Sequence, residues 1–395
     1  MFATVMAVSS APIVAANWIE SPADPIYNPF PAATLLEDYF PIVIYDGNKF
    51  SGHGDAYFYK MWHQGADGIA LSHSNDGINW TLKGNVIGGS AFHPCVIYDM
   101  NGFGGGTYYY KAWYWTGTPG TTVSVIQYSQ SSDGVTWTSP TPITQDPSSP
   151  LVDGIAGGYF YHLYGPGAVL YNPVATSTPG QPFTYPYVMF YDTSSEGFGP
   201  DSSVEQIALA YSSDGLTWKR YGSEPVLIPS GAIGDWDGTH AFRPSVVRVR
   251  GAYYMVYSGS NDNIDPGSSI PYAHGIGAAT SGDGIHWTKS APNPVFSYAD
   301  GVAWRNSRTY APSVLLSPEG SQLQMWFSGG SGFTAGTSQG IGYATLSVFR
   351  ASPVPTLSQW HLVFLTLLLG AAALRHLSRS RGGESREVVG QIERT

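Results

Sequence analysis

The chain repeats one order of apolar segments five times. Each repeat opens with an aromatic residue two positions before a proline: Tyr39 and Pro41, Phe92 and Pro94, Tyr164 and Pro166, Phe242 and Pro244, Tyr310 and Pro312. A second segment follows and reads YKMWH, YKAWY, YVMFY, YYMVY and LQMWF. A third segment begins at Ile69, Ile126, Ile207, Ile276 and Ile341. Short runs rich in aromatic and β-branched residues predict strands, and their recurrence at a long, regular spacing predicts a repeated supersecondary unit.

A polar turn motif follows the third segment in four of the repeats. It reads SNDGINW, SSDGVTW, SSDGLTW and SGDGIHW, and it ends at Trp80, Trp137, Trp218 and Trp287. Asp-Gly between two strands is a strong hairpin signal, because it tolerates the positive φ angles of a tight turn. The motif therefore predicts a fourth strand and a four-stranded meander in each unit. We expect the repeated tryptophans to pack between neighbouring units.

The fifth repeat lacks this turn and this strand, and the missing strand is predicted at the other end of the chain. WIESPADPIY from Trp18 matches WTKSAPNPVF from Trp287 and WKRYGSEPVL from Trp218. We expect Trp18 to Tyr27 to pair antiparallel with Ile341 to Leu346, which leaves no open sheet edge. The pattern predicts an all-β, five-bladed β-propeller over residues 17–348, with the last blade closed by the N-terminal strand.

Composition supports this fold class and narrows the function. Glycine (48), tyrosine (27) and tryptophan (12) are abundant, whereas only 12% of residues are charged, which suits turn-rich aromatic strands. The net charge of -10 comes without a basic cluster before the last thirty or so residues, which argues against nucleic-acid binding. Cys95 is the only cysteine, so no intrachain disulfide forms, and we expect it to be buried.

Both ends of the chain have the character of targeting segments. Residues 1–16 are apolar and rich in small residues, and Val14-Ala15-Ala16 fits a signal-peptide cleavage site, although no charged n-region precedes it. Residues 349–381 contain an apolar run, Leu362 to Leu374, followed by arginines. This order predicts one C-terminal transmembrane helix and a cytoplasmic tail over residues 382–395.

The segment around this run resembles the IPTL-CTERM sorting signal of Gram-negative bacteria. Pro355, Thr356, Leu357 and Trp360 match the motif, whereas Val354 and His361 replace its isoleucine and glycine. The resemblance implies export, anchoring in the inner membrane, and processing by signal peptidase and an exosortase-type transpeptidase. A plain C-terminal anchor is the alternative.

The repeated unit resembles the five-bladed glycosidase superfamily of arabinanases, β-xylosidases, fructosidases and mannoside phosphorylases. The resemblance implies an axial funnel in which three carboxylates act on a glycan. Hydrolysis needs at least two carboxyl groups beside the glycosidic bond. The residues before the five repeat prolines are Phe40, His93, Gly165, Arg243 and Ala311, and none is a carboxylate.

Other carboxylates lie close to these openings. The catalytic candidates are Asp38, Asp153, Asp235 and Asp237, with Asp38 as the best candidate for a base. The candidates for gripping a sugar carboxylate, a phosphate or an ion are His93, His162, His240 and Arg243. The candidates for stacking on sugar rings are Trp236, Trp304 and Tyr161. For each residue a loop, capping or packing role is the competing interpretation.

Two functions lead at this point, and a purely structural surface-layer role is third. One is an exported glycoside hydrolase-like enzyme, and the other is a non-catalytic carbohydrate-binding or surface module that has lost the catalytic carboxylates. Two carboxylates facing each other across the axis would favour the enzyme, whereas a channel holding only His93 and Arg243 would favour binding. No cofactor or metal ligand set is indicated, and a structural calcium ion stays an open question. We also expect Arg243→Ala to remove ligand binding and to leave folding nearly unchanged.

Overall fold

The computed structural model describes residues 17–28, 39–117, 125–155, 157–195, 204–232, 234–261, 275–331 and 339–348. Across these residues the protein is all-β, with short helical turns at α1 (Gly102–Gly105), η1 (Lys49–Gly52), η2 (Pro182–Thr184), η3 (Tyr298–Asp300) and η4 (Ala303–Arg305). None of these helices has the length and apolar character needed to cross a membrane. The predicted signal segment and the predicted transmembrane helix lie outside the described residues.

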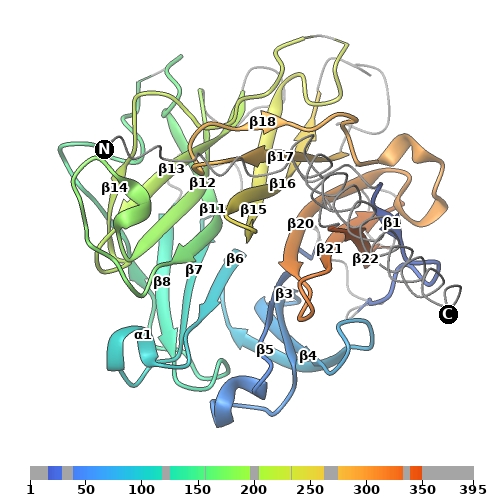
Figure 1. Cartoon of the computed structure of the whole chain (residues 1–395), viewed down its shortest axis with the longest axis horizontal. Helices are drawn as coiled ribbons and strands as arrows, with labels where there is room; N and C mark the ends of the chain where they lie inside the picture. Colours follow the sequence, from blue (N-terminus) through green and yellow to red (C-terminus); the bar gives the residue numbers. More distant parts are fainter. Residues whose placement is uncertain are drawn as a thin grey trace, which may run out of the picture. The chain divides into compact units, whose positions relative to one another are not determined.

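The strands form four-stranded antiparallel meanders, which we number as units one to five along the chain (Figure 1). Unit one contains β2 (Ile42–Tyr45), β3 (Tyr59–Gly65), β4 (Gly68–Ser74) and β5 (Thr81–Ile87). Unit two contains β6 (Ala91–Tyr98), β7 (Tyr110–Thr116), β8 (Val125–Ser131) and β9 (Thr141–Pro142). Unit three contains β11 (His162–Tyr171), β12 (Tyr187–Ser194), β13 (Glu205–Ser212) and β14 (Thr217–Arg220), and β10 (Thr144–Gln145) pairs in parallel with β14.

Unit four contains β15 (His240–Val249), β16 (Ala252–Ser260), β17 (Gly275–Ser281) and β18 (Thr288–Lys289), with β19 (Phe296–Ser297) also on β17. Unit five contains β20 (Arg308–Leu316), β21 (Gln322–Gly330), β22 (Gln339–Ser347) and β1 (Ile19–Glu20). A single parallel bridge between β13 and β15 links units three and four. The first strands contact one another in a closed cycle, from β2 to β6, β11, β15, β20 and back to β2.

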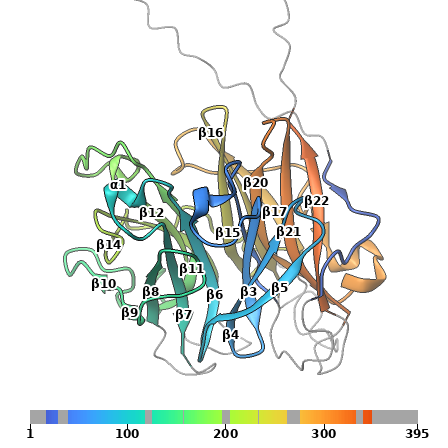
Figure 2. The same cartoon turned by 90° about the horizontal axis from the view of Figure 1, so that it is seen from below.

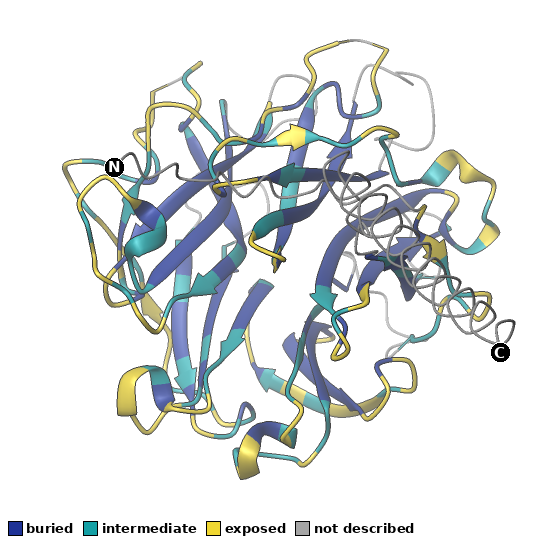
Figure 3. Ribbon diagram, in the orientation of Figure 1, coloured by how far each residue is buried: buried dark blue, intermediate teal, exposed yellow. Residues whose placement is uncertain are grey.

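Most buried residues lie on the strands, and many exposed residues lie in the connections, although β5 is also largely exposed (Figure 3). Separate hydrophobic clusters fill the spaces between consecutive sheets, and Trp62, Trp113, Trp218 and Trp326 are fully buried in these layers. In the turned view of Figure 2 the strands run between two ends that carry the connections. Adjacent sheets therefore bury each other's faces.

The repeated turn motif is explained by a tryptophan contact between units. In the copy that ends at Trp218, Ser212 Oγ accepts from the Gly215 amide at 2.9 Å, and Asp214 caps the next two amides. Gly215 has φ +81°, as the predicted Asp-Gly turn requires. Its carbonyl accepts from Trp218 Nε1 at 3.0 Å and from Trp113 Nε1 of unit two at 2.8 Å. One carbonyl thus joins two units.

The same arrangement recurs elsewhere in the described units. Gly134 O accepts from Trp137 and from Trp62, and Gly77 O accepts from Trp80 and from Trp326. At the fourth copy, Trp287 packs edge-to-face on Phe190, which lacks an N–H donor on its ring. The prediction that the repeated tryptophans pack between units is confirmed.

We expect Gly215→Ala to lower the free energy of unfolding by about 1–3 kcal/mol, because an alanine at positive φ is strained. Its Cβ would also lie 3.0 Å from the Trp113 ring. Gly251→Ala is the matched control, since Gly251 has φ +90° but no heavy atom within 4 Å of an added Cβ. Urea unfolding should show the larger loss for Gly215→Ala, and equal losses would contradict a role for the tryptophan contact.

The N-terminal strand closes unit five as predicted. Ile19 pairs with Thr345 and Glu20 with Ala344 in antiparallel register, and Tyr27 forms a bridge with Ile341. More than three hundred residues of sequence separate the two sides of this contact.

Buried polar contacts hold this strand in place. Arg305, with 2% of its surface exposed, donates from Nη2 to Glu20 Oε2 at 2.8 Å and from Nε to Oε1 at 3.1 Å. Asp24 accepts from the Tyr343 amide through both carboxylate oxygens, and burial raises the pKa of Asp24 to about 7. Trp18 Nε1 donates to the Tyr254 hydroxyl of unit four at 3.2 Å. We call Glu20, Asp24 and Arg305 the closure clasp.

Candidate functional site

The residue before each repeat proline has a left-handed backbone. The φ angles are +44° at Phe40, +52° at His93, +146° at Gly165, +50° at Arg243 and +52° at Ala311. The register of β6, β11, β15 and β20 shifts at this point, so the strands carry bulges. Bulges re-aim side chains, and strained residues recur at functional sites. This repetition in all five units points to the centre of the molecule as the candidate site.

Hydrogen bonds from the preceding unit hold several of these strained residues. In three units, the residue directly after the five-residue second segment accepts the amide N–H of the left-handed residue in the next unit. Asp192 Oδ1 accepts from Arg243 at 2.9 Å, and Ser258 Oγ accepts from Ala311 at 2.8 Å. Ser328 Oγ accepts from Phe40 at 3.1 Å, across the junction between units five and one. Hydrogen bonds from neighbouring units therefore stabilise the strained backbone conformations.

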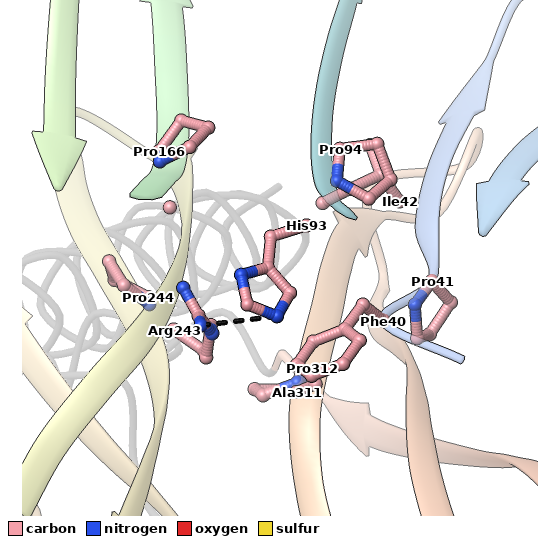
Figure 4. A pocket seen from close by; sticks show the side chains of 11 residues that line it. Phe40, Pro41, Ile42, His93, Pro94, Pro166, Arg243, Pro244, Ala311 and Pro312 are labelled. Carbon is pink, nitrogen blue, oxygen red and sulfur yellow. Dashed lines mark hydrogen bonds between the residues drawn. The ribbon is translucent and has the colours of Figure 1, made fainter. Parts of the chain in front are cut away.

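The segments around the five repeat prolines surround an axial pocket (Figure 4). It holds about 290 Å³ of empty space, including the part open to solvent. The residues that line it are Phe40, Pro41, Ile42, His93, Pro94, Pro166, Gly167, Arg243, Pro244, Ala311 and Pro312. Figure 4 shows His93 and Arg243 facing each other, with the repeat prolines around them. The pocket thus brings together two of the predicted ligand-binding residues.

Arg243 is held by partners from units two and three. Its Nη1 donates to Asp192 Oδ2 at 2.6 Å, and its Nη2 lies 3.3 Å from His93 Nε2. Asp192 is fully buried, whereas 12% of the Arg243 side chain is exposed. The guanidinium carbon lies 5.4 Å from the centroid of the Phe40 ring, a cation–π distance. Three units therefore position this one cation.

Burial shifts the charge states around the pocket. Desolvation raises the pKa of Asp192 to about 7, although the Arg243 charge opposes the shift, and Glu205 adds to it. Desolvation, and then the Arg243 charge, hold the pKa of His93 well below its usual value. His93 is therefore neutral near pH 7, and its Nε2 can accept from Arg243.

None of the predicted catalytic aspartates that the structure describes lines the pocket. Asp153 pairs with Arg220 at 3.4 Å, and Asp237 is buried against Lys289 and the Tyr257 hydroxyl. Asp235 is exposed in the loop before β15. Asp38 lies outside the described residues.

The other predicted ligand residues also lie away from the pocket lining. The Trp236 ring packs 5.7 Å from the Tyr257 ring, and Trp304 Nε1 donates to Glu20 at 3.1 Å, beside the closure clasp. Tyr161 is partly buried beside His162 at the start of β11. His162 and His240 are buried at the starts of β11 and β15.

Sequence reasoning missed two carboxylates, Asp192 and Glu205. Glu205 Oε2 lies 3.7 Å from His240 Nδ1, where units three and four meet. Asp192 could have been found by aligning the repeats, because the residue directly after the five-residue second segment is Gln64, Trp115, Asp192, Ser258 and Ser328. A carboxylate in a buried strand implies a cationic partner. That partner, Arg243, is 51 residues away and belongs to the next unit.

Two comparisons place parts of the chain among known proteins. The C-terminal segment, residues 352–381, matches a family described as the IPTL-CTERM motif. This segment is a sorting signal. It confirms the resemblance around Leu357 and Trp360, and it points to an exported, cell-surface protein. A search of curated proteins found no match.

Solved structures with the same fold include glycoside hydrolases. One is described as "Glycoside hydrolase"; it is 18% identical with a TM-score of 0.52, covering 80% of this chain and 88% of that chain. Another is an N-acetylgalactosamine deacetylase from F. plautii in complex with blood group B trisaccharide, 17% identical with a TM-score of 0.54, covering 84% and 94%. A third comes from the GH130 family of mannoside phosphorylases, 13% identical with a TM-score of 0.54, covering 83% and 94%. At these identities the likeness establishes the fold alone.

Proposed function

We propose that this chain is an exported, cell-surface carbohydrate-binding protein with a five-bladed β-propeller over residues 17–348. Each four-stranded unit is one blade, and the N-terminal strand completes the fifth. The closed cycle of contacts among the first strands supports the blade count. The axial pocket is then the ligand site, since concave sites with a few fixed polar groups are the usual place for small ligands.

The proposed path to the surface uses both ends of the chain. Residues 1–16 act as the signal segment cut by signal peptidase. Residues 349–381 act as the sorting signal with its transmembrane helix, and residues 382–395 form the cytoplasmic tail. An exosortase-type transpeptidase then releases the chain from the inner membrane. The IPTL-CTERM match supports this order of events.

The composition of the axial pocket supports binding rather than hydrolysis. Its lining contains His93 and Arg243 and, among the described residues, no carboxylate. The buried carboxylate of Asp192 accepts two hydrogen bonds from Arg243, one from its amide and one from its guanidinium. Hydrolysis of a glycosidic bond uses two carboxyl groups placed on either side of that bond. The described site lacks this pair.

A glycoside hydrolase is the second candidate. Asp38 immediately precedes the described residues Tyr39 and Phe40, and Phe40 lines the pocket. The pKa of about 7 for Asp192 would also suit a proton donor. In that case Asp38 would act as the base and Asp192 as the acid.

Binding and hydrolysis can be separated with the full chain on a glycan panel. We expect saturable binding to at least one glycan, measured by calorimetry, without new reducing ends after prolonged incubation. Arg248→Ala serves as a control, because Arg248 is exposed on the same strand as Arg243. Release of reducing ends that Asp38→Asn abolishes would replace the binding proposal with the hydrolase. Failure to bind any glycan would overturn both.

A further inference from the structure

The axial pocket presents a single positive charge in an apolar ring. Five of its lining residues are prolines, which have no backbone N–H to donate. Phe40, Ile42, Gly167 and Ala311 add no polar side-chain group. With His93 neutral, the guanidinium of Arg243 is the one charged group among the described lining residues. A ligand group in the pocket therefore meets one cation.

This cation is oriented before any ligand arrives. Asp192 and His93 engage Nη1 and Nη2, so that three of the five guanidinium N–H bonds have no hydrogen bond to the described residues. Arg243 Nε is buried and has no hydrogen-bond partner among the described groups. The Arg243 amide is also fixed, by Asp192 Oδ1. A side chain held in this way loses little conformational freedom on binding.

Building on the proposed function, we infer that the sugar unit entering the axial pocket is acidic and that its carboxylate pairs with Arg243. A carboxylate is planar and carries one negative charge, which one guanidinium can balance. A phosphate dianion would need further donors, and the proline ring offers none. The apolar ring of Phe40 and the prolines suits the carbon face of the same sugar.

Asp192 gives the inference a second, independent consequence. The carboxylate of Asp192 on β12 faces Arg243 on β15. Glu205 lies nearby on β13, and Gly165 of β11 pairs with Asp192 in the sheet. His93 of β6 lies beyond the guanidinium, and His240 lies 3.7 Å from Glu205. A bound carboxylate shares the charge of Arg243, so that Asp192 binds a proton more readily in the complex. Linkage then makes binding tighter at lower pH.

The test compares uronate oligosaccharides with their methyl esters, which keep the size and lose the charge. Calorimetry on the full chain should show at least a tenfold lower Kd for the acid than for the ester. Arg243→Lys keeps the charge but loses the planar fork, and we expect it to remove most of this selectivity. Between pH 6 and pH 8 the Kd for the acid should rise several-fold, and Asp192→Asn should flatten the profile.

The possible outcomes are distinguishable. Equal affinity for acid and ester would overturn the inference and leave the proposed glycan binding intact. Saturable binding of inorganic phosphate without binding of uronates would also overturn it. A flat pH profile in the unmodified chain would overturn the part assigned to Asp192. If either variant fails to fold, the comparison of acid with ester on the unmodified chain still decides.

Discussion

Deletion of residues 17–27 is expected to make the protein aggregate or melt far below the parent. The deletion removes Trp18 and Glu20, exposes the backbone of the Ile341 strand, and leaves Arg305 buried without its main partner. An uncovered strand edge promotes aggregation, and a buried cation without its partner is strongly destabilising. No disulfide is available to hold the ring, since Cys95 is the only cysteine. Differential scanning calorimetry and light scattering would measure the effect.

Single substitutions in this strand separate the effect of losing a buried side chain from the effect of shortening the chain. We expect Trp18→Ala to lower the free energy of unfolding by about 3–5 kcal/mol, the range for loss of a large buried aromatic side chain. Ile19→Ala is the matched control, because the neighbouring Ile19 is 68% exposed and should change stability by less than about 0.5 kcal/mol. A deletion as stable as the parent would contradict the closed ring and the blade count that rests on it.

The second large effect is expected for Arg243→Ala in the axial pocket. This substitution should lower the free energy of unfolding by about 3–5 kcal/mol at pH 8, because it leaves the buried carboxylate of Asp192 without its cation. This reverses the expectation from sequence that the substitution leaves folding nearly unchanged. The 2.6 Å ion pair and the full burial of Asp192 are the reason. Urea unfolding with circular dichroism would measure the loss.

The same variant should be less destabilised in acid. The pKa of Asp192 is raised in the folded protein, to about 7 from 3.8, so folding favours the protonated group at low pH. Removal of Arg243 raises this pKa further, because Arg243 opposes the shift. Around pH 5 Asp192 is protonated with or without Arg243, so no unpaired charge is buried there. The loss should therefore be larger at pH 8 than at pH 5.

A double variant checks the cause. Arg243→Ala combined with Asp192→Asn should be more stable at pH 8 than Arg243→Ala alone, because no buried charge remains. Arg248→Ala, on an exposed position of β15, should stay within about 1 kcal/mol of the parent. A loss for Arg243→Ala that is the same at both pH values, or that Asp192→Asn does not reduce, would contradict the ion pair as the cause.

The sequence by itself determined the repeated architecture. Strand order, the Asp-Gly turns and the pairing of Trp18 to Tyr27 with the last strand are local patterns, copied several times, and repetition makes each copy evidence for the others. The residues around the axial pocket were also predictable, because the residue before each repeat proline occupies the same position in every repeat. His93 and Arg243 were found in this way.

Only the tertiary structure decided which charges meet. Arg243 and Asp192 come from different units, whereas Glu20 and Arg305 both belong to unit five but lie 285 residues apart in the sequence, and these pairs have no fixed spacing that a pattern could reveal. The aspartates chosen from nearness to the openings, such as Asp153 and Asp237, are paired elsewhere. Sequence distance says little about distance in a closed ring, because side chains far apart in the sequence meet: Asp192 and Arg243, from neighbouring units, are 51 residues apart, and Glu20 and Arg305, where the two ends of the ring join, are 285 residues apart. The charge of the axial pocket is therefore a property of the assembled ring.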